Sequence, residues 1–287
     1  MPPDELPPVP EPLPLPVVDN HAHLDHARVG SEPVAVDRAI SAAAGVNVTR
    51  MVQIGCDLES ARWTVQAVEQ HPELLGGVAL HPTEASDLFH RGVSSGTTAL
   101  QDAFAEIERL ASHPRIRVIG ETGLDHHWVK PDDVAGRAAQ QDSFRWHIDL
   151  AKRLGKVLQI HDRDAHVDVL RILDQEGAPE RTVFHCFSGD AEMARHCADR
   201  GWYLSFAGTL TFKNAAALRE SLALMPPALV QVETDAPYLA PMPYRGRPNA
   251  GYLVPITVRC MSEVTGRSLD QVCADLDASA EQLYGPW

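Results

Sequence analysis

The sequence predicts an α/β fold, a TIM-type (β/α)8 barrel with a metal site at the C-terminal ends of its strands. Two observations indicate this class. Eight short apolar runs alternate with helix-like segments, and metal-ligand residue types follow several of these runs. Barrel enzymes keep their chemistry at that end of the strands. The alternative, an open doubly wound sheet, predicts a glycine-rich phosphate loop after the first strand, and none is present there.

Most candidate strands are continuous apolar runs, as expected for parallel strands that are buried on both faces. They are Val17–Val18, Arg50–Gly55, Gly76–Leu80, Arg117–Gly120, Val157–Ile160, Thr182–Phe184, Trp202–Phe206 and Leu229–Val232. Segments with helical periodicity lie between and after them. The predicted helices are Val34–Ala44, Leu58–Gln70, Thr98–Ser112, Val134–Leu154, Ala165–Gln175, Ala191–Arg200, Ala215–Leu224, Ile256–Val264 and Asp270–Leu283.

The chain of 287 residues fits one large catalytic domain, which we place at residues 17–287. Residues 1–16 are rich in proline, and their only charged side chains are acidic. This composition predicts an extended, mobile tail, with a proline-motif ligand as the alternative. No interior proline- or glycine-rich run is typical of a domain linker.

Composition restricts the partners and the compartment. The formal net charge of −14 argues against broad binding of duplex nucleic acid, which needs a basic surface. It leaves room for a nucleic-acid substrate that metals and a few arginines hold at one end. No apolar stretch could span a bilayer, and no obligate protein partner is evident. Five cysteines without a C-x-x-C pair indicate neither a zinc knuckle nor a disulfide framework, so we expect a cytoplasmic protein.

Two histidines, His21 and His23, follow the first predicted strand. Residues i and i+2 of an extended segment point the same way, so both side chains can bind one metal. Pairs with this spacing also occur by chance on protein surfaces. The position directly after a buried strand is what makes this pair a candidate site.

A glutamate and two further histidines follow later strands: Glu121, His161 and His185. A glutamate beside a buried strand end is costly to desolvate unless it is paired or bound to a cation. Its two oxygens can also bridge two metals. Taken singly, the glutamate could cap a helix or form a salt bridge, and each histidine could belong to the core. Their equivalent positions favour a shared metal site.

Asp235 follows the last predicted strand. There its carboxylate could bind a metal and accept a proton from a bound water. The alternative role is to initiate the turn before Pro237.

Basic residues in or near the loops that follow strands are candidates for phosphate contacts. They are Arg163, Lys213, Arg245 and Arg247. The last two, separated by one glycine, could form bidentate hydrogen bonds with a phosphate. Alternatively, they could be solvated loop arginines. Residues 126–128, His-His-Trp, could stack on a base or pack a loop.

Five segments together resemble the TatD family of metal-dependent deoxyribonucleases, in the amidohydrolase superfamily. They are Asp19–Asp25, Gly120–Asp125, Ile160–Ala165, His185–Gly189 and Glu233–Pro241. The match runs in order from about Val17 to Gly285. The chain departs from the family pattern at Asn20 and Ala22, where Thr and Cys are more usual, and at Asp162 and residues 126–127. No departure removes a metal ligand.

The resemblance implies two divalent metal ions. Its implied assignment gives one ion to His21, His23 and Asp235 and the other to His161 and His185, with Glu121 between the ions. His81 would lie near the substrate, with Arg163 and Glu233 as supporting residues. Four histidine ligands favour zinc or manganese, whereas the resemblance also admits magnesium, so all three stay open.

The implied activity is hydrolysis of phosphodiester bonds from the 3′ end of single-stranded DNA, which releases 5′-mononucleotides. Asp235 would accept the proton of the attacking water. An alternative is a superfamily hydrolase for an ester, amide or lactone, including an aminoacyl-tRNA deacylase. Glu121 disfavours the branches that use a carboxylated lysine as the bridging ligand. A metal-stabilised interaction module is a third interpretation, and the complete ligand set argues against it.

Overall fold

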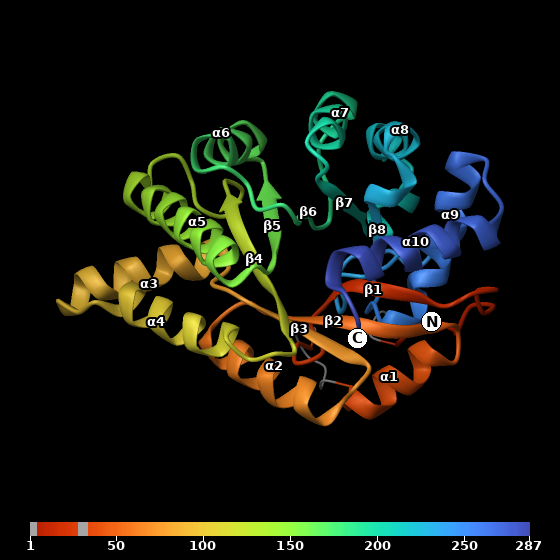
Figure 1. Cartoon of the computed structure of the whole chain (residues 1–287), viewed down its shortest axis with the longest axis horizontal. Helices are drawn as coiled ribbons and strands as arrows, with labels where there is room; N and C mark the ends of the chain where they lie inside the picture. The colour runs from red at the N-terminus through yellow and green to blue at the C-terminus, as the bar shows by residue number, and fades with distance from the viewer. Residues whose placement is uncertain (1–4, 28–33) are drawn as a thin grey trace. The chain divides into compact units, whose positions relative to one another are not determined.

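The structure is a computed structural model, and it describes residues 5–27 and 34–287. Eight strands follow one another in the sheet in chain order and alternate with helices, the order of a (β/α)8 barrel (Figure 1). The strands are β1 (Val17–Ala22), β2 (Val48–Gly55), β3 (Leu74–Val78), β4 (Ile116–Asp125), β5 (Val157–Arg163), β6 (Thr182–Phe184), β7 (Tyr203–Phe206) and β8 (Val230–Val232). All eight predicted strands are therefore confirmed.

The α-helices of the described residues are α1 (Val36–Ala44), α2 (Leu58–Gln70), α3 (Pro82–Ser95), α4 (Ala99–Ala111), α5 (Val134–Leu154), α6 (His166–Glu176), α7 (Ala191–Asp199), α8 (Ala216–Leu224), α9 (Val254–Thr265) and α10 (Leu269–Tyr284). The nine predicted helices are confirmed to within two residues at each end. None of the described helices is both long and apolar enough to cross a bilayer.

Helix α3 was not among the helices predicted from the sequence. Its buried positions, which include Ala85 and Leu88, recur with helical periodicity as in the predicted helices, so the amphipathic pattern was present. The signals at its two ends were stronger. The side chain of His81 accepts a hydrogen bond from Thr83 N, Pro82 occupies the first turn, and Gly96 ends the helix with a left-handed φ of 68°. These end signals could have revealed the helix.

The chain divides into two compact units. Unit 1 contains residues 1–53, 71–75 and 185–287, and unit 2 contains residues 54–70 and 76–184. In unit 1, β1 pairs with β2 and β7 pairs with β8, both in parallel. Helix α10 packs against β1 and β8, and α9 packs against α8 and α10. Apolar residues of these strands and helices, such as Val17 and Leu276, form the core of this unit.

In unit 2, parallel pairing joins β3 to β4, β4 to β5 and β5 to β6. Helix α5 packs on α3 and on β4, and α2 packs on α4 (Figure 1). Their buried apolar residues include Phe144, Ile107 and Ile160. Strand β4 is longer than predicted and extends to Asp125, so Glu121 lies within the strand.

Residues 5–16 belong to unit 1 and contain no helix or strand, and we call them the N-terminal strap. Proline has no N–H group, so a proline-rich strap must be held mainly through its carbonyl oxygens. Arg247 Nε donates to the Glu5 carbonyl at 2.9 Å, and the Tyr252 hydroxyl donates to the Pro7 carbonyl at 2.5 Å. The strap is therefore anchored by side chains of the segment that follows β8.

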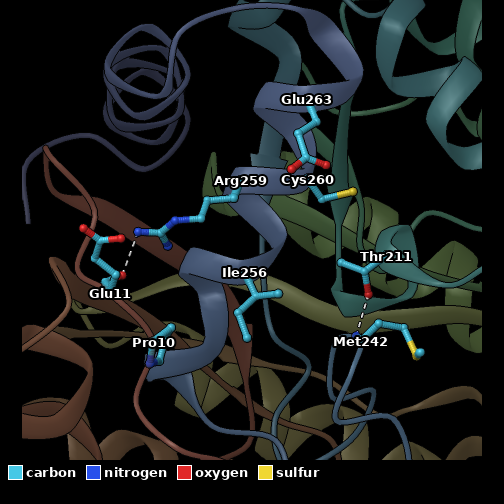
Figure 2. A pocket seen from close by; sticks show the side chains of 8 residues that line it. All are labelled: Pro10, Glu11, Thr211, Met242, Ile256, Arg259, Cys260 and Glu263. Atoms are coloured by element: carbon cyan, nitrogen blue, oxygen red, sulfur yellow. Dashed lines mark hydrogen bonds between the residues drawn. The ribbon is translucent and has the colours of Figure 1, made fainter.

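The second half of the strap is anchored as well. Arg259 of α9 donates to the Glu11 carbonyl at 2.8 Å, at the edge of a pocket shown in Figure 2. The Leu13 side chain is buried, and its carbonyl accepts from Asn47 Nδ2 at 2.6 Å. The described part of the tail contains no helix or strand, and the predicted extended, mobile conformation stays a prediction. Residues 1–4 lie outside the described residues.

Candidate metal centre

Histidines and carboxylates gather in two clusters, one in each unit. The first cluster, in unit 1, contains His21, His23, His185, Glu233 and Asp235. The second cluster, in unit 2, contains His81, Glu121, Asp125 and His161.

Three ligand atoms of the first cluster converge. His21 Nε2 and His23 Nε2 are 3.2 Å apart, and Asp235 Oδ1 lies 3.7 Å and 3.3 Å from them. The two histidines come from β1 and its end, as the H-x-H spacing predicted. Two imidazole nitrogens that face each other so closely cannot both carry a proton. Their lone pairs and the carboxylate form a donor set that suits a divalent cation such as zinc or manganese.

Asp235 reaches this position because the backbone after β8 lies against the end of β1. Asp235 N donates to the His21 carbonyl at 2.9 Å, and His23 N donates to the Ala236 carbonyl at 2.8 Å. Asp235 has a φ of 55°, in the left-handed region that aspartate tolerates better than most residues. Burial raises the pKa of Asp235, but the hydrogen bond and charge of His23 outweigh this and lower it overall.

A second buried carboxylate supports the same turn. Asp19 is fully buried and accepts hydrogen bonds from Thr234 N at 2.9 Å and from Thr234 Oγ1 at 2.7 Å. Burial raises the pKa of Asp19 to about 7, although these hydrogen bonds oppose the shift. Asp19 thereby ties β1 to the residue that precedes Asp235.

His185 stacks on His21, with ring centroids 4.0 Å apart and an angle of 16° between the rings. Its Nδ1 lies 3.3 Å from Glu233 Oε1, which also accepts from Cys186 N at 2.8 Å. A carboxylate on one ring nitrogen fixes the tautomer and directs the other nitrogen toward a metal. Glu233 therefore orients His185.

The Glu233 carboxylate is itself positioned by a hydrogen bond from a buried asparagine. Asn20 Nδ2 donates to Glu233 Oε2 at 3.5 Å, and the Tyr284 hydroxyl of α10 donates to Asn20 Oδ1. All three side chains are buried. A chain of hydrogen bonds thus runs from the C-terminal helix to His185. Asn20 is a position where the chain departs from the family pattern.

The second cluster is centred on His161 of β5. Its Nδ1 lies 2.6 Å from Glu121 Oε1, and its Nε2 lies 3.1 Å from Asp125 Oδ2. Glu121 Oε1 also lies 3.4 Å from His81 Nε2. Two imidazoles and two carboxylates form a more oxygen-rich donor set than that of the first cluster, and it also fits a divalent cation.

Charges within the second cluster are complementary. Burial raises the pKa of Asp125, but hydrogen bonds from His161 and from Trp128 N outweigh it, so the pKa falls to about 2. Burial and the neighbouring His161 lower the pKa of His81, which favours its neutral form. Asp125 is therefore an anion and His81 a neutral imidazole near pH 7.

The pairing of β4 and β5 sets the position of His161. Gly123 of β4 is in register with His161 and has a φ of 143°. A Cβ atom at Gly123 would lie 2.1 Å from the His161 carbonyl oxygen, so only glycine allows this approach.

The predicted phosphate-binding residues are in different surroundings. Arg247 is engaged by the strap, as described above. The guanidinium of Arg245 lies 4.5 Å from the centroid of the Phe212 ring, and that of Arg163 lies 5.7 Å from the Trp128 ring. Lys213 is exposed.

The sequence analysis did not select Asp125, Asn20 or Tyr284. Asp125 could have been found, because it lies four residues after Glu121 and so on the same face of one strand. Tyr284 is 264 residues from Asn20, so no local pattern links them. Within unit 1 the structure brings together His21, His23, His185, Glu233 and Asp235, and within unit 2 it brings together His81, Glu121 and His161. The expected bridging by Glu121 stays a prediction.

A family model described as TatD related DNase matches residues 18–285. A metal-dependent hydrolase from Mycobacterium tuberculosis, named TatD and described as uncharacterized, is 45% identical over 271 residues. The alignment covers 94% of this chain and 98% of the relative. The uncharacterized metal-dependent hydrolase YabD of Bacillus subtilis is 32% identical over 268 residues, with coverages of 93% and 98%.

Solved structures agree on the fold. The TatD homologue YJJV of Escherichia coli K12 superimposes with a TM-score of 0.81 at 21% identity, covering 94% of this chain and 98% of that one. A mutant organophosphorus hydrolase gives a TM-score of 0.60 at 14% identity, covering 94% of this chain and 93% of that one. The TIM-type barrel predicted from the sequence is thereby confirmed.

Proposed function

Because the chain belongs to the TatD family and is a metal-dependent hydrolase, we propose that it cleaves phosphodiester bonds of DNA with two divalent metal ions. The proposed substrate is the 3′ end of single-stranded DNA, and the proposed products are 5′-mononucleotides. The observation that carries the proposal is that each unit holds a cluster of two or more histidines and two carboxylates.

We assign one ion to His21, His23 and Asp235 in the first cluster and a second ion to the second cluster, with His161 as a principal ligand. The assignment of His185 to the second ion and of Glu121 to both ions follows the family resemblance and stays a prediction. When bound, divalent ions polarise phosphoryl oxygens and lower the pKa of water.

Asp235 is the proposed proton acceptor. Its lowered pKa keeps the carboxylate ionised near pH 7, so it can take a proton from the attacking water. Glu233 fixes the ring of His185, and Asp125 fixes the ring of His161, so neither imidazole has to reorient during turnover.

The protein has few cations for a polyanionic substrate, which favours contact with a short segment near one end. The proposed phosphate contacts are the exposed Arg163, Lys213 and Arg245. Arg247 is a weaker candidate than the sequence suggested, because strap carbonyls already occupy its guanidinium.

The proposal is tested with metal-stripped protein reloaded separately with zinc, manganese or magnesium. Substrates are single-stranded oligonucleotides with free, 3′-blocked or 5′-blocked ends, compared with RNA, esters, lactones and aminoacyl-tRNA. We expect release of 5′-mononucleotides from free 3′ ends, and protection by a 3′ block. Turnover of an ester, a lactone or aminoacyl-tRNA without any cleavage of DNA would refute the proposal.

A further inference from the structure

A cavity of about 290 Å³ in unit 1 opens beside His23 of the first cluster. Helix α1 and the loop after β8 provide walls that include Ala42, Pro237 and Tyr252, and the strap provides Leu6. The cavity shares a wall with a proposed metal ligand. A group bound in it would therefore lie next to the group bound at the metal.

The size of the cavity limits its occupant. Pockets for small molecules usually measure about 300–1,000 Å³, so this one lies at the lower end and suits one ring system. Its walls are mostly apolar. Two polar side chains in the lining are already engaged: Asn249 Nδ2 donates to the Thr234 carbonyl at 2.8 Å, and the Tyr252 hydroxyl donates to the strap. Such walls favour a flat apolar surface over a specific hydrogen-bonding pattern.

Two histidines, His23 and His26, line the cavity, and Tyr238 lies next to them outside the lining. The rings of His23 and His26 are stacked, with centroids 4.9 Å apart and an angle of 14° between them. The ring of Tyr238 lies 6.3 Å from that of His23 and is 44% exposed. Rings of this kind bind nucleobases by stacking, with little preference for one base over another.

The strap supplies the outer rim. Val9 lines the cavity and is 63% exposed, an unusually large exposed apolar surface for a residue in an anchored segment. Arg38 of α1, also exposed, lies in the same lining and adds a positive charge. An apolar wall with a cation at its rim matches a nucleotide, which has a flat base and a charged phosphate.

We propose that this cavity binds one nucleobase of the substrate, the base nearest the phosphodiester bond that is cleaved. The strap completes the subsite, so the proline-rich N-terminus contributes directly to substrate binding. This inference rests on the proposed function. It predicts that the enzyme recognises the presence of a base there, but not its identity.

The test measures binding to metal-free protein in EDTA, where no turnover occurs. The probes are two single-stranded oligonucleotides with a 5′ fluorophore, one ending in 2-aminopurine at its 3′ end and the other abasic at that position. We expect the first to bind about tenfold more tightly, with quenching of the 2-aminopurine fluorescence, since stacking on aromatic rings supplies the difference. Equal affinities and an unquenched base would overturn the proposal.

Two variants locate the effect. Ala42→Phe fills the cavity, and Val9→Asp places a charge on its apolar wall at an exposed position that folding tolerates. Both should lower the preference for the base to less than about threefold. Ala217→Phe, at an exposed position of α8 outside the cavity, should keep the tenfold preference. Retention of the full preference by Val9→Asp, with thermal unfolding unchanged, would contradict the assignment.

The failure of this inference is distinguishable from failure of the proposed function. With metal restored, hydrolysis of both oligonucleotides at equal kcat/KM would overturn the base subsite and leave the nuclease activity standing. Absence of hydrolysis with zinc, manganese and magnesium would overturn the proposed function and, with it, this inference.

Discussion

The two clusters differ in what holds their histidines. In the first cluster, His185 is oriented by Glu233, which is supported through Asn20 by Tyr284 at the end of the chain. In the second cluster, both ring nitrogens of His161 meet carboxylates from the neighbouring strand β4. The first cluster therefore depends on residues far apart in the sequence, and the second depends largely on one strand pair.

This difference has a chemical consequence. The nitrogens of His21 and His23 face each other and can share one cation, whereas each ring nitrogen of His161 already faces a carboxylate. We expect the first cluster to favour zinc and the second to accept harder ions such as manganese or magnesium.

The largest effect is expected for Asp235→Asn. Asparagine tolerates the left-handed φ of this position, so the fold should persist, while the proton acceptor is lost. We expect kcat to fall by about 10³-fold or more at saturating metal. Circular dichroism and the Tm should match those of the wild type. Wild-type kcat in this variant would refute the assigned role of Asp235.

A pH effect in unit 2 is expected next, from His147, which lies outside both clusters. His147 is fully buried, its Nε2 accepts from Leu80 N at 3.3 Å, and burial lowers its pKa to about 4. Since the unfolded chain protonates this group near pH 6.5, stability should fall as the pH drops from about 6.5 to 4. The loss approaches about 3 kcal/mol.

This pH effect is measured by urea unfolding in EDTA at several pH values. The difference between the wild type and His147→Gln isolates the contribution of this histidine from that of the carboxylates. The variant should lose less stability between pH 6.5 and 4. Parallel curves for the two proteins would show that His147 does not titrate in this window.

Glu233→Gln and Asp125→Asn compare the two clusters directly. Each removes a carboxylate that orients a histidine, His185 in the first cluster and His161 in the second, so each should lower metal affinity by about 10–100-fold. Titration of metal-free protein with zinc and with manganese would measure both affinities. Glu220→Gln, at an exposed position of α8, is the matched control. Unchanged metal affinity in either variant would contradict the orienting role of that carboxylate.

Tyr284→Phe should have the smallest effect. It removes the hydroxyl that donates to Asn20 Oδ1, a buried hydrogen bond worth about 1 kcal/mol in unfolding free energy. Because Glu233 keeps its contacts with Cys186 N and His185, metal affinity should change by only about twofold to threefold. A loss as large as that of Glu233→Gln would show that the hydroxyl governs the position of His185.

The sequence predicted those parts of the site that depend on local patterns. Apolar runs located the strands, and the residues that follow them located His21, His161 and Asp235. Asn20 and Tyr284 could not be predicted from local patterns, because the hydrogen bond that joins them links segments at opposite ends of the chain.

The strap shows the same limit. Its proline content predicted an extended tail, but composition does not reveal which distant side chains bind its carbonyls. Arg247 was assigned to phosphate for the same reason, since its sequence neighbours do not show that Glu5 and Leu6 occupy its guanidinium.

The most direct test of the proposed two-metal centre is the metal content of the purified protein, measured by mass spectrometry after reloading with zinc or manganese. The wild type should hold two ions per chain. His21→Ala and His161→Ala should each retain one, and the double variant none. A wild type with one ion or fewer, or single variants that both lose all metal, would contradict the assignment of one ion to each cluster.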